Sequence, residues 1–146
     1  SHKQYTICST DSIIEELAAS MDISYTDAFE YIQNKKKFDY VTQKFFEKIR
    51  NCIINDENFI IDRTHLKRNI RISLINELKT IATEHGKHLE LFAVSFEIPN
   101  KIIFERLKKR EKKTRKFIPR QVIYEQINSF NIPTIDEGFN AIERIN

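Results

Sequence analysis

One short apolar run in the sequence ends abruptly in groups that can bind a metal ion or a phosphate. The run 59–61 leads into Asp62, and Thr64 and His65 follow closely. Such a run is typical of a buried parallel strand, and open α/β sheets bind ligands at the carboxyl ends of their strands. A carboxylate placed there is suited to meet Mg²⁺ and phosphate. Asp62, Thr64 and His65 are therefore candidate substrate-binding residues.

Two groups of positive charge provide candidate anion sites. Arg106 and Arg110 lie four residues apart, so on a helix both guanidinium groups can reach one phosphate chain. Arginine stabilises the charge of a transferring phosphoryl group better than lysine does, because its donors are planar and paired. Lys67, Arg68 and Arg71 lie near the expected amino end of another helix, where positive charge opposes the helix dipole. This placement indicates an anionic partner, although a solvated helix face explains many charge runs equally well.

The composition is that of one soluble globular domain. The chain has 146 residues, of which 40% are hydrophobic and 31% are charged. We expect no membrane association and a cytoplasmic location, because no apolar segment approaches the roughly 20 residues that cross a bilayer and no signal pattern opens the chain. Cys8 and Cys52 are expected to be free, buried thiols. The net charge is +3, and the positive side chains are most concentrated between Lys108 and Lys116, which favours a polyanionic partner.

Periodicity and turn residues predict that strands and helices alternate along the chain. The pattern favours an α/β fold: a small, mostly parallel sheet of three or four strands, flanked by helices on both faces, in a single domain over residues 1–146. Strands are expected at 4–8, 59–62, 89–96 and 142–145, and helices at 12–19, 24–33, 38–54, 67–84, 101–112 and from Pro119 onward.

Four pieces of sequence, in this order, carry a resemblance to a known family. They are ICSTD at 7–11, FIIDRTHL at 59–66, ERLKKR at 105–110 before FIP at 117–119, and FNIPT at 130–134 before EGF at 137–139. In order and spacing they resemble the phage-type polynucleotide 5′-kinases, a branch of the P-loop kinases. The resemblance extends from Tyr5 to Ile145 and implies ATP and Mg²⁺ as cofactors and a nucleic-acid 5′ end as the partner.

The resemblance also implies roles for individual residues. Asp11 would be the general base beside the 5′-hydroxyl, although an Asp at this place is also a favoured helix N-cap. Asp62 would lie near the metal or the substrate, with a helix cap as the alternative, and His65 stands where the family has Asn. Arg106 and Arg110 would be the lid arginines that clamp the transferring phosphoryl group.

One part of a P-loop kinase is absent from the sequence. The only glycines are Gly86 and Gly138, and neither lies in a Gly-rich loop that ends in Gly-Lys-Ser or Gly-Lys-Thr. In the resembled kinases this loop follows a first strand in the middle of the sheet, so its loss leaves two neighbouring strands with unpaired backbone groups. Three solutions are open: a complementing segment from a longer protein or another chain, re-pairing of the remaining strands, or a homo-oligomer formed through exposed edges.

Three functions are consistent with these features. The first is phosphoryl transfer from ATP to a nucleic-acid 5′-hydroxyl, incomplete until the missing loop is supplied. The second is a non-catalytic pseudo-kinase that binds nucleic acid or a protein partner. The third is a phosphotransferase for a small molecule, since related P-loop enzymes share acids at strand ends and lid arginines, and the fold alone does not select a substrate.

Overall fold

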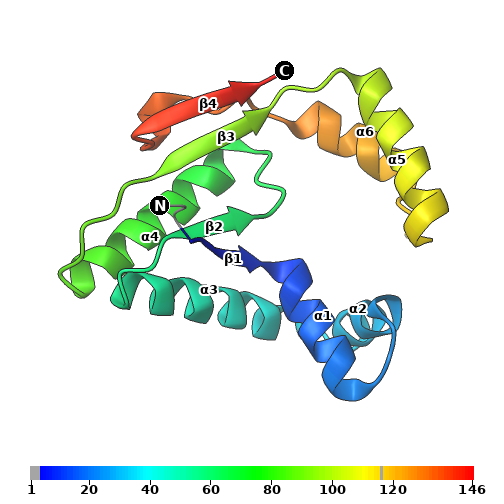
Figure 1. The fold of residues 1–146 in the computed structure, drawn as a ribbon, viewed down its shortest axis with the longest axis horizontal. Helices are drawn as coiled ribbons and strands as arrows, with labels where there is room; N and C mark the ends of the chain where they lie inside the picture. The colour runs from blue at the N-terminus through cyan, green and yellow to red at the C-terminus, as the bar shows by residue number, and fades with distance from the viewer. Residues whose placement is uncertain (1–3, 116) are drawn as a thin grey trace. The chain divides into compact units, whose positions relative to one another are not determined.

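The computed structural model describes residues 4–115 and 117–146, so Lys116, the last residue of the expected basic run, lies outside the described part (Figure 1). The chain divides into two compact units, each described here by itself. The first comprises Ser1–Thr64 and Lys79–Leu89, and the second comprises His65–Leu78 and Glu90–Asn146. Helix α4 (Arg68–Glu84) contributes residues to both.

The first unit is built on a parallel pair of strands followed by helices. Strands β1 (Thr6–Ser9) and β2 (Phe59–Asp62) pair with Ser9 opposite Asp62. Helices α1 (Thr10–Met21), α2 (Tyr25–Asn34) and α3 (Phe38–Ile54) lie between them in the chain. Helix α1 begins at Thr10 because the Ser9 hydroxyl accepts a hydrogen bond from the Ser12 backbone N–H at 3.3 Å.

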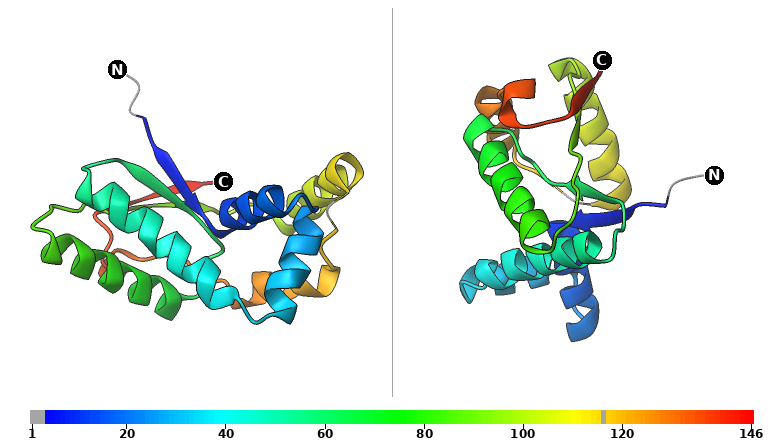
Figure 2. Two further views of the ribbon diagram at one scale, coloured as in Figure 1. Left: turned by 90° about the horizontal axis from the view of Figure 1, so that it is seen from below. Right: turned by 90° about the vertical axis from the view of Figure 1, so that its left-hand side faces the viewer.

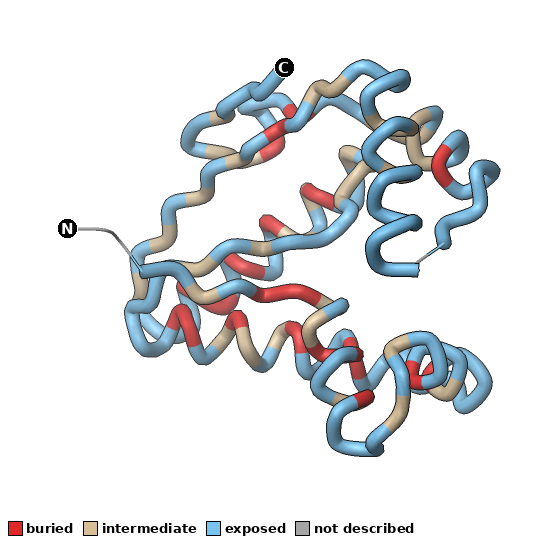
Figure 3. Tube along the Cα trace, turned by 45° about the vertical axis from the view of Figure 1, so that its right-hand side comes forward, coloured by how far each residue is buried: buried red, intermediate tan, exposed pale blue. Residues whose placement is uncertain are grey.

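The core of the first unit lies on one face of this strand pair, where α3 packs against β1. Cys8 on β1 and Phe45, Ile49 and Cys52 on α3 are all buried (Figure 3). Side chains alternate between faces along a strand, so the neighbours of Cys8 point the other way. The outward pair is Ile7 opposite Ile60, and these side chains are 56% and 48% exposed.

The second unit holds another parallel pair, β3 (Phe92–Phe96) with β4 (Ala141–Ile145) (Figure 2). Helices α5 (Asn100–Thr114) and α6 (Arg120–Ser129) and the short 3₁₀ helix η1 (Ile135–Glu137) lie between these strands. On β3 the small residue Ser95 is buried, whereas the apolar residues of the opposite face are open to solvent. These residues are Phe92, Val94 and Phe96, which are 63%, 52% and 65% exposed.

The α/β class expected from the sequence is confirmed, and the helix Phe38–Ile54 and the strand Phe59–Asp62 have the predicted bounds. The arrangement of the strands differs from the expectation. The four described strands form two separate two-stranded parallel sheets, β1–β2 and β3–β4, rather than one sheet. Apolar side chains also stay exposed on one face of each pair.

Both glycines follow the end of a helix and adopt the left-handed backbone conformation. Gly86 has φ +62° and follows α4, and Gly138 has φ +118° at the end of η1. Neither belongs to a phosphate-binding loop. None of the helices within the described part of the chain combines the length and the apolar character that crossing a membrane requires.

Candidate functional site

The carboxyl edge of the β1–β2 pair brings together residues that are distant in sequence. Because the two strands are parallel and Ser9 pairs with Asp62, both strands end at the same edge of the sheet. Asp11 follows two residues after Ser9, and Thr64 follows two residues after Asp62. Asp11, Asp62 and Thr64 are all exposed. This edge therefore presents two carboxylates and a hydroxyl to solvent, as the sequence predicted.

Asp11 is not the N-cap of α1, since Ser9 holds that position. Its carboxylate instead accepts a hydrogen bond from the Tyr25 hydroxyl, with 2.8 Å between the phenol oxygen and Oδ1. Tyr25 in turn stacks on Phe29 with 6.4 Å between ring centroids, and Phe29 meets Phe38 edge-on at 6.0 Å. These ring contacts, which run from α2 to the start of α3, thus orient the Tyr25 hydroxyl that holds Asp11. Sequence spacing gave no signal for Tyr25.

Asp62 is likewise not a helix cap, because α4 begins six residues later at Arg68. Arg63, which the sequence analysis did not single out, lies with its guanidinium carbon 4.8 Å from the centre of the Phe45 ring. Loss of water around this group lowers the pKa of Arg63, but an arginine keeps its charge at neutral pH. Arg63 therefore adds a fixed positive charge next to Asp62.

Arg71, a predicted substrate-binding residue of the second unit, is buried and internally paired. Its Nε and Nη2 donate to the two carboxylate oxygens of Glu137, each at 2.7 Å. Its Nη1 donates to the backbone oxygens of His65 and Leu66 at 3.0 and 2.9 Å. The hydrogen bonds from Arg71 lower the pKa of Glu137, whose side chain is fully buried.

Arg68 forms a second, more exposed ion pair on the same turn. Its Nη2 lies 2.7 Å from an oxygen of Asp136, and its Nη1 donates to the Thr134 hydroxyl. The hydrogen bond from Arg68 lowers the pKa of Asp136 to about 2. The two arginines at the start of α4 are thus paired with carboxylates from 66 to 69 residues away in the chain. The placement of these arginines therefore has an internal explanation, and a substrate-binding role for Arg68 and Arg71 stays a prediction.

The remaining predicted residues also belong to the second unit. His65 is half-buried at its start, and its backbone oxygen holds Arg71. Arg106 and Arg110 are exposed on α5, four residues apart as predicted. The predicted site is therefore divided, with Asp11, Asp62 and Thr64 in the first unit and the histidine and the arginines in the second.

The donors in the described chain suit a magnesium ion that phosphates help to hold. Within residues 4–115 and 117–146 no group of three or more His, Cys, Asp or Glu side chains is placed to bind a metal. Mg²⁺ commonly takes only one or two carboxylates and completes its shell with water and substrate phosphates. Asp62, exposed at a strand end, is a carboxylate of this kind.

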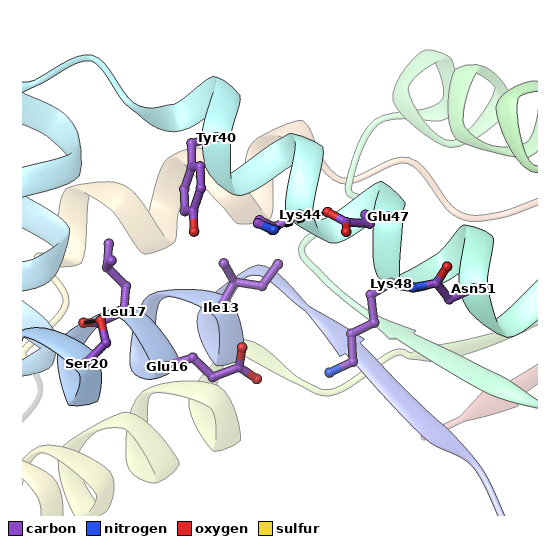
Figure 4. A pocket seen from close by; sticks show the side chains of 9 residues that line it. All are labelled: Ile13, Glu16, Leu17, Ser20, Tyr40, Lys44, Glu47, Lys48 and Asn51. Carbon is purple, nitrogen blue, oxygen red and sulfur yellow. Dashed lines mark hydrogen bonds and ion pairs between the residues drawn. The ribbon is translucent and has the colours of Figure 1, made fainter.

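A pocket of about 440 Å³ lies between α1 and α3, and none of the predicted site residues lines it (Figure 4). Its charges cancel, because Lys44 and Lys48 stand against Glu16 and Glu47, and Lys44 pairs with Glu47 at 3.3 Å. Tyr40, Ile13 and Leu17 complete much of its wall. The pocket therefore has no net charge to attract a phosphate.

Comparison with known proteins gives one result. A family model described as AAA domain matches residues 1–133. A search of curated proteins found no match. The matched region includes both strands of the first unit, strand β3, and helices α5 and α6. The chain therefore belongs to the AAA domain family, whose members are P-loop NTPase-like kinases that generally bind nucleotide with Mg²⁺.

Proposed function

We propose that the chain is the part of a polynucleotide 5′-kinase that carries the general base and the lid, and that it transfers the γ-phosphoryl group of ATP to a nucleic-acid 5′-hydroxyl once a phosphate-binding loop is supplied. The observation that carries this proposal is the environment of Asp11. A carboxylate at the carboxyl edge of a parallel strand pair, exposed and oriented by a tyrosine rather than used as a cap, is suited to accept a proton.

In this proposal Asp11 accepts the proton of the attacking hydroxyl. The oxygen then attacks the γ-phosphorus, the bond to the bridging oxygen of ATP breaks, and ADP leaves. Tyr25 fixes the direction of the carboxylate through its 2.8 Å hydrogen bond, which limits the geometries from which the hydroxyl can approach. Tyr25 is thus a positioning residue for Asp11.

When bound, ATP would supply the phosphoryl group and Mg²⁺ would neutralise charge on its oxygens. Asp62 would hold the ion at the strand end, and Thr64 and His65 would contact the substrate beside it. Arg71 would support this contact by holding the backbone oxygens of His65 and Leu66, and the partly exposed Arg68 would attract an anionic substrate despite its ion pair with Asp136.

Arg106 and Arg110 would clamp the transferring group. Both are exposed on one side of α5, and within the described residues neither forms an ion pair with a carboxylate. Their donors are thus available for an incoming phosphate. Removing such an arginine lowers the rate of phosphoryl transfer, by up to about 10³ to 10⁵ for arginine fingers.

The missing loop would come with a complementing strand, from the rest of a longer protein or from a separate chain. Parallel sheets are normally covered on both faces, yet both strand pairs carry exposed apolar faces. An added strand with its following helix would pair a free strand edge and cover apolar side chains. A second copy of this chain would cover the same faces without providing a Gly-rich loop.

The test combines the chain with labelled ATP, Mg²⁺ and a 5′-hydroxyl oligonucleotide, with and without a peptide that carries a strand and a loop ending in Gly-Lys-Ser. Transfer that requires the peptide supports the proposal. Asp11→Asn should then lower kcat by about 10² to 10⁴. Asp22→Asn is the matched control, since Asp22 lies just past the other end of α1 in a left-handed conformation that Asn also adopts. Equal rates in the two variants would contradict the role of Asp11.

The second candidate is a pseudo-kinase that binds nucleic acid without turnover. The dense positive charge of α5 favours it, because this charge needs no phosphate loop to act. Salt-sensitive binding of the oligonucleotide, with no transfer under any complementation, would select this function.

A further inference from the structure

Helix α5 carries an unusual density of positive charge in its second half. Seven of the ten residues 106–115 are basic, and Glu111 is the only acid among them. All seven basic side chains are exposed. They are Arg106, Lys108, Lys109, Arg110, Lys112, Lys113 and Arg115.

The cations occupy every side of α5 except the one that packs. Ile103, Phe104 and Leu107 form a half-buried stripe, and the Phe104 ring lies 5.3 Å from the Tyr124 ring of α6. At 3.6 residues per turn, Lys109, Lys112 and Lys113 lie opposite this stripe. Within the described residues, none of the seven forms an ion pair with a carboxylate. Like charges at this spacing repel each other, so an anion that neutralises them stabilises the helix.

An exposed aromatic ring follows the cationic helix directly. Arg115 ends α5 in a left-handed conformation, and Phe117 leads toward α6 with 67% of its surface exposed. Ile118 beside it is 37% exposed. Most of this phenylalanine surface therefore stays in contact with water beside a cluster of cations. Cations that track a backbone together with aromatic rings that stack on bases are the two components of single-strand binding surfaces.

We propose that the outer face of α5, with Phe117 at its end, is a contact surface for single-stranded nucleic acid. Lys109, Lys112 and Lys113 contact consecutive phosphates, and Phe117 stacks on an unpaired base. The proposal rests on the proposed function, which makes a nucleic acid the acceptor. It adds a surface that binds the strand at a place other than the reacting 5′ end. A membrane surface fits less well, because the Phe104 ring in the apolar stripe of α5 already contacts the Tyr124 ring of α6.

The first test measures the fluorescence anisotropy of a labelled single-stranded oligonucleotide against salt concentration, without ATP. Replacing Lys109, Lys112 and Lys113 together with Gln should reduce the slope of log K against log salt by about 2, since each lost phosphate contact contributes about 0.7. At about 0.1 M salt this corresponds to an affinity about a hundredfold lower. The control replaces the same number of lysines in the run Lys35–Lys37 of the first unit, and this variant should keep the parental slope.

The second test separates stacking from charge. Phe117→Leu keeps an apolar side chain but removes the ring, and it should weaken single-strand binding about five- to a hundredfold while binding of a blunt duplex stays unchanged. Equal losses in the two lysine variants, an unaltered single-strand affinity in Phe117→Leu, or tighter binding to vesicles of anionic lipid than to the oligonucleotide would each overturn the proposal. Because no ATP is present, a failure of phosphoryl transfer leaves these results intact and remains a separate outcome.

Discussion

The buried pair of Arg71 and Glu137 should dominate the stability of the second unit. Arg71→Met removes the guanidinium but keeps most of the side-chain volume, and it leaves the fully buried Glu137 carboxylate without its bidentate partner. The backbone oxygens of His65 and Leu66 lose a donor in the same step. Breaking a buried ion pair on one side costs about 3 to 5 kcal/mol, because the remaining charge stays out of water. We expect the free energy of unfolding to fall by this amount.

The double variant Arg71→Met with Glu137→Leu tests whether the cost arises from the unpaired charge. Two well-packed apolar residues often replace a buried pair at little net cost. Glu137 also accepts the Thr134 backbone N–H at 3.2 Å, so part of the loss should remain, about 1 kcal/mol for that hydrogen bond. The double variant should therefore be more stable than Arg71→Met alone.

Denaturant unfolding followed by circular dichroism gives the total effect, and hydrogen exchange of peptides from each unit locates it. Amides of β3 and β4 should exchange faster in Arg71→Met, whereas amides of β1 and β2 should change little, since both partners belong to the second unit. A loss below about 1 kcal/mol, or effects that simply add in the double variant, would refute the assignment of a strong buried pair.

Three further outcomes follow from groups with an unusual environment. Arg71 lowers the pKa of Glu137, and Arg68 lowers the pKa of Asp136 to about 2. Both ionised carboxylates therefore stabilise the fold fully above the ordinary carboxyl range, and this stabilisation is lost as the pH falls from about 4.3 toward 2. Acid unfolding curves will measure the loss. The Ser95 hydroxyl is buried and has no hydrogen-bond partner in the described part of the chain, so Ser95→Ala should raise the free energy of unfolding by about 1 kcal/mol in denaturant titrations. Burial, followed by the nearby Cys52, raises the pKa of the Cys8 thiol to about 12, so a thiol reagent at pH 8 should modify Cys8 only at the rate of local unfolding.

Elements with strong local signals were predictable from the sequence. The stripe of Val41, Phe45 and Ile49 determined α3, and the apolar run before Asp62 determined β2. The edge position of Asp11 also followed from local order, because a strand that leads directly into a helix places the first helical residues at the carboxyl end. The prediction that the cysteines are free and buried is confirmed as well.

The partners of the arginines could not be predicted, because they depend on contacts over long sequence distances. Arg68 and Arg71 meet Asp136 and Glu137 only after η1 has turned its acids toward α4, and a local helix-dipole argument contains no such contact. The hydrogen bond from Tyr25 to Asp11 depends on how α2 packs on α1, which periodicity does not fix. Local patterns therefore identified the charged groups but not which of them are satisfied inside the protein.

The exposed strand faces connect stability with the proposed chemistry. Two-stranded parallel pairs with Ile7 and Ile60, or Phe92 and Phe96, open to water are not sheets that hold themselves together. A segment that pairs a free edge and covers such a face binds only the folded chain, so at a hundred times its dissociation constant it should raise the free energy of unfolding by about 2.7 kcal/mol. If that same segment carries the phosphate loop, stability and phosphoryl transfer should rise over one range of its concentration. Transfer that appears without the stabilisation would mean that the loop reaches the site by another route than the sheet.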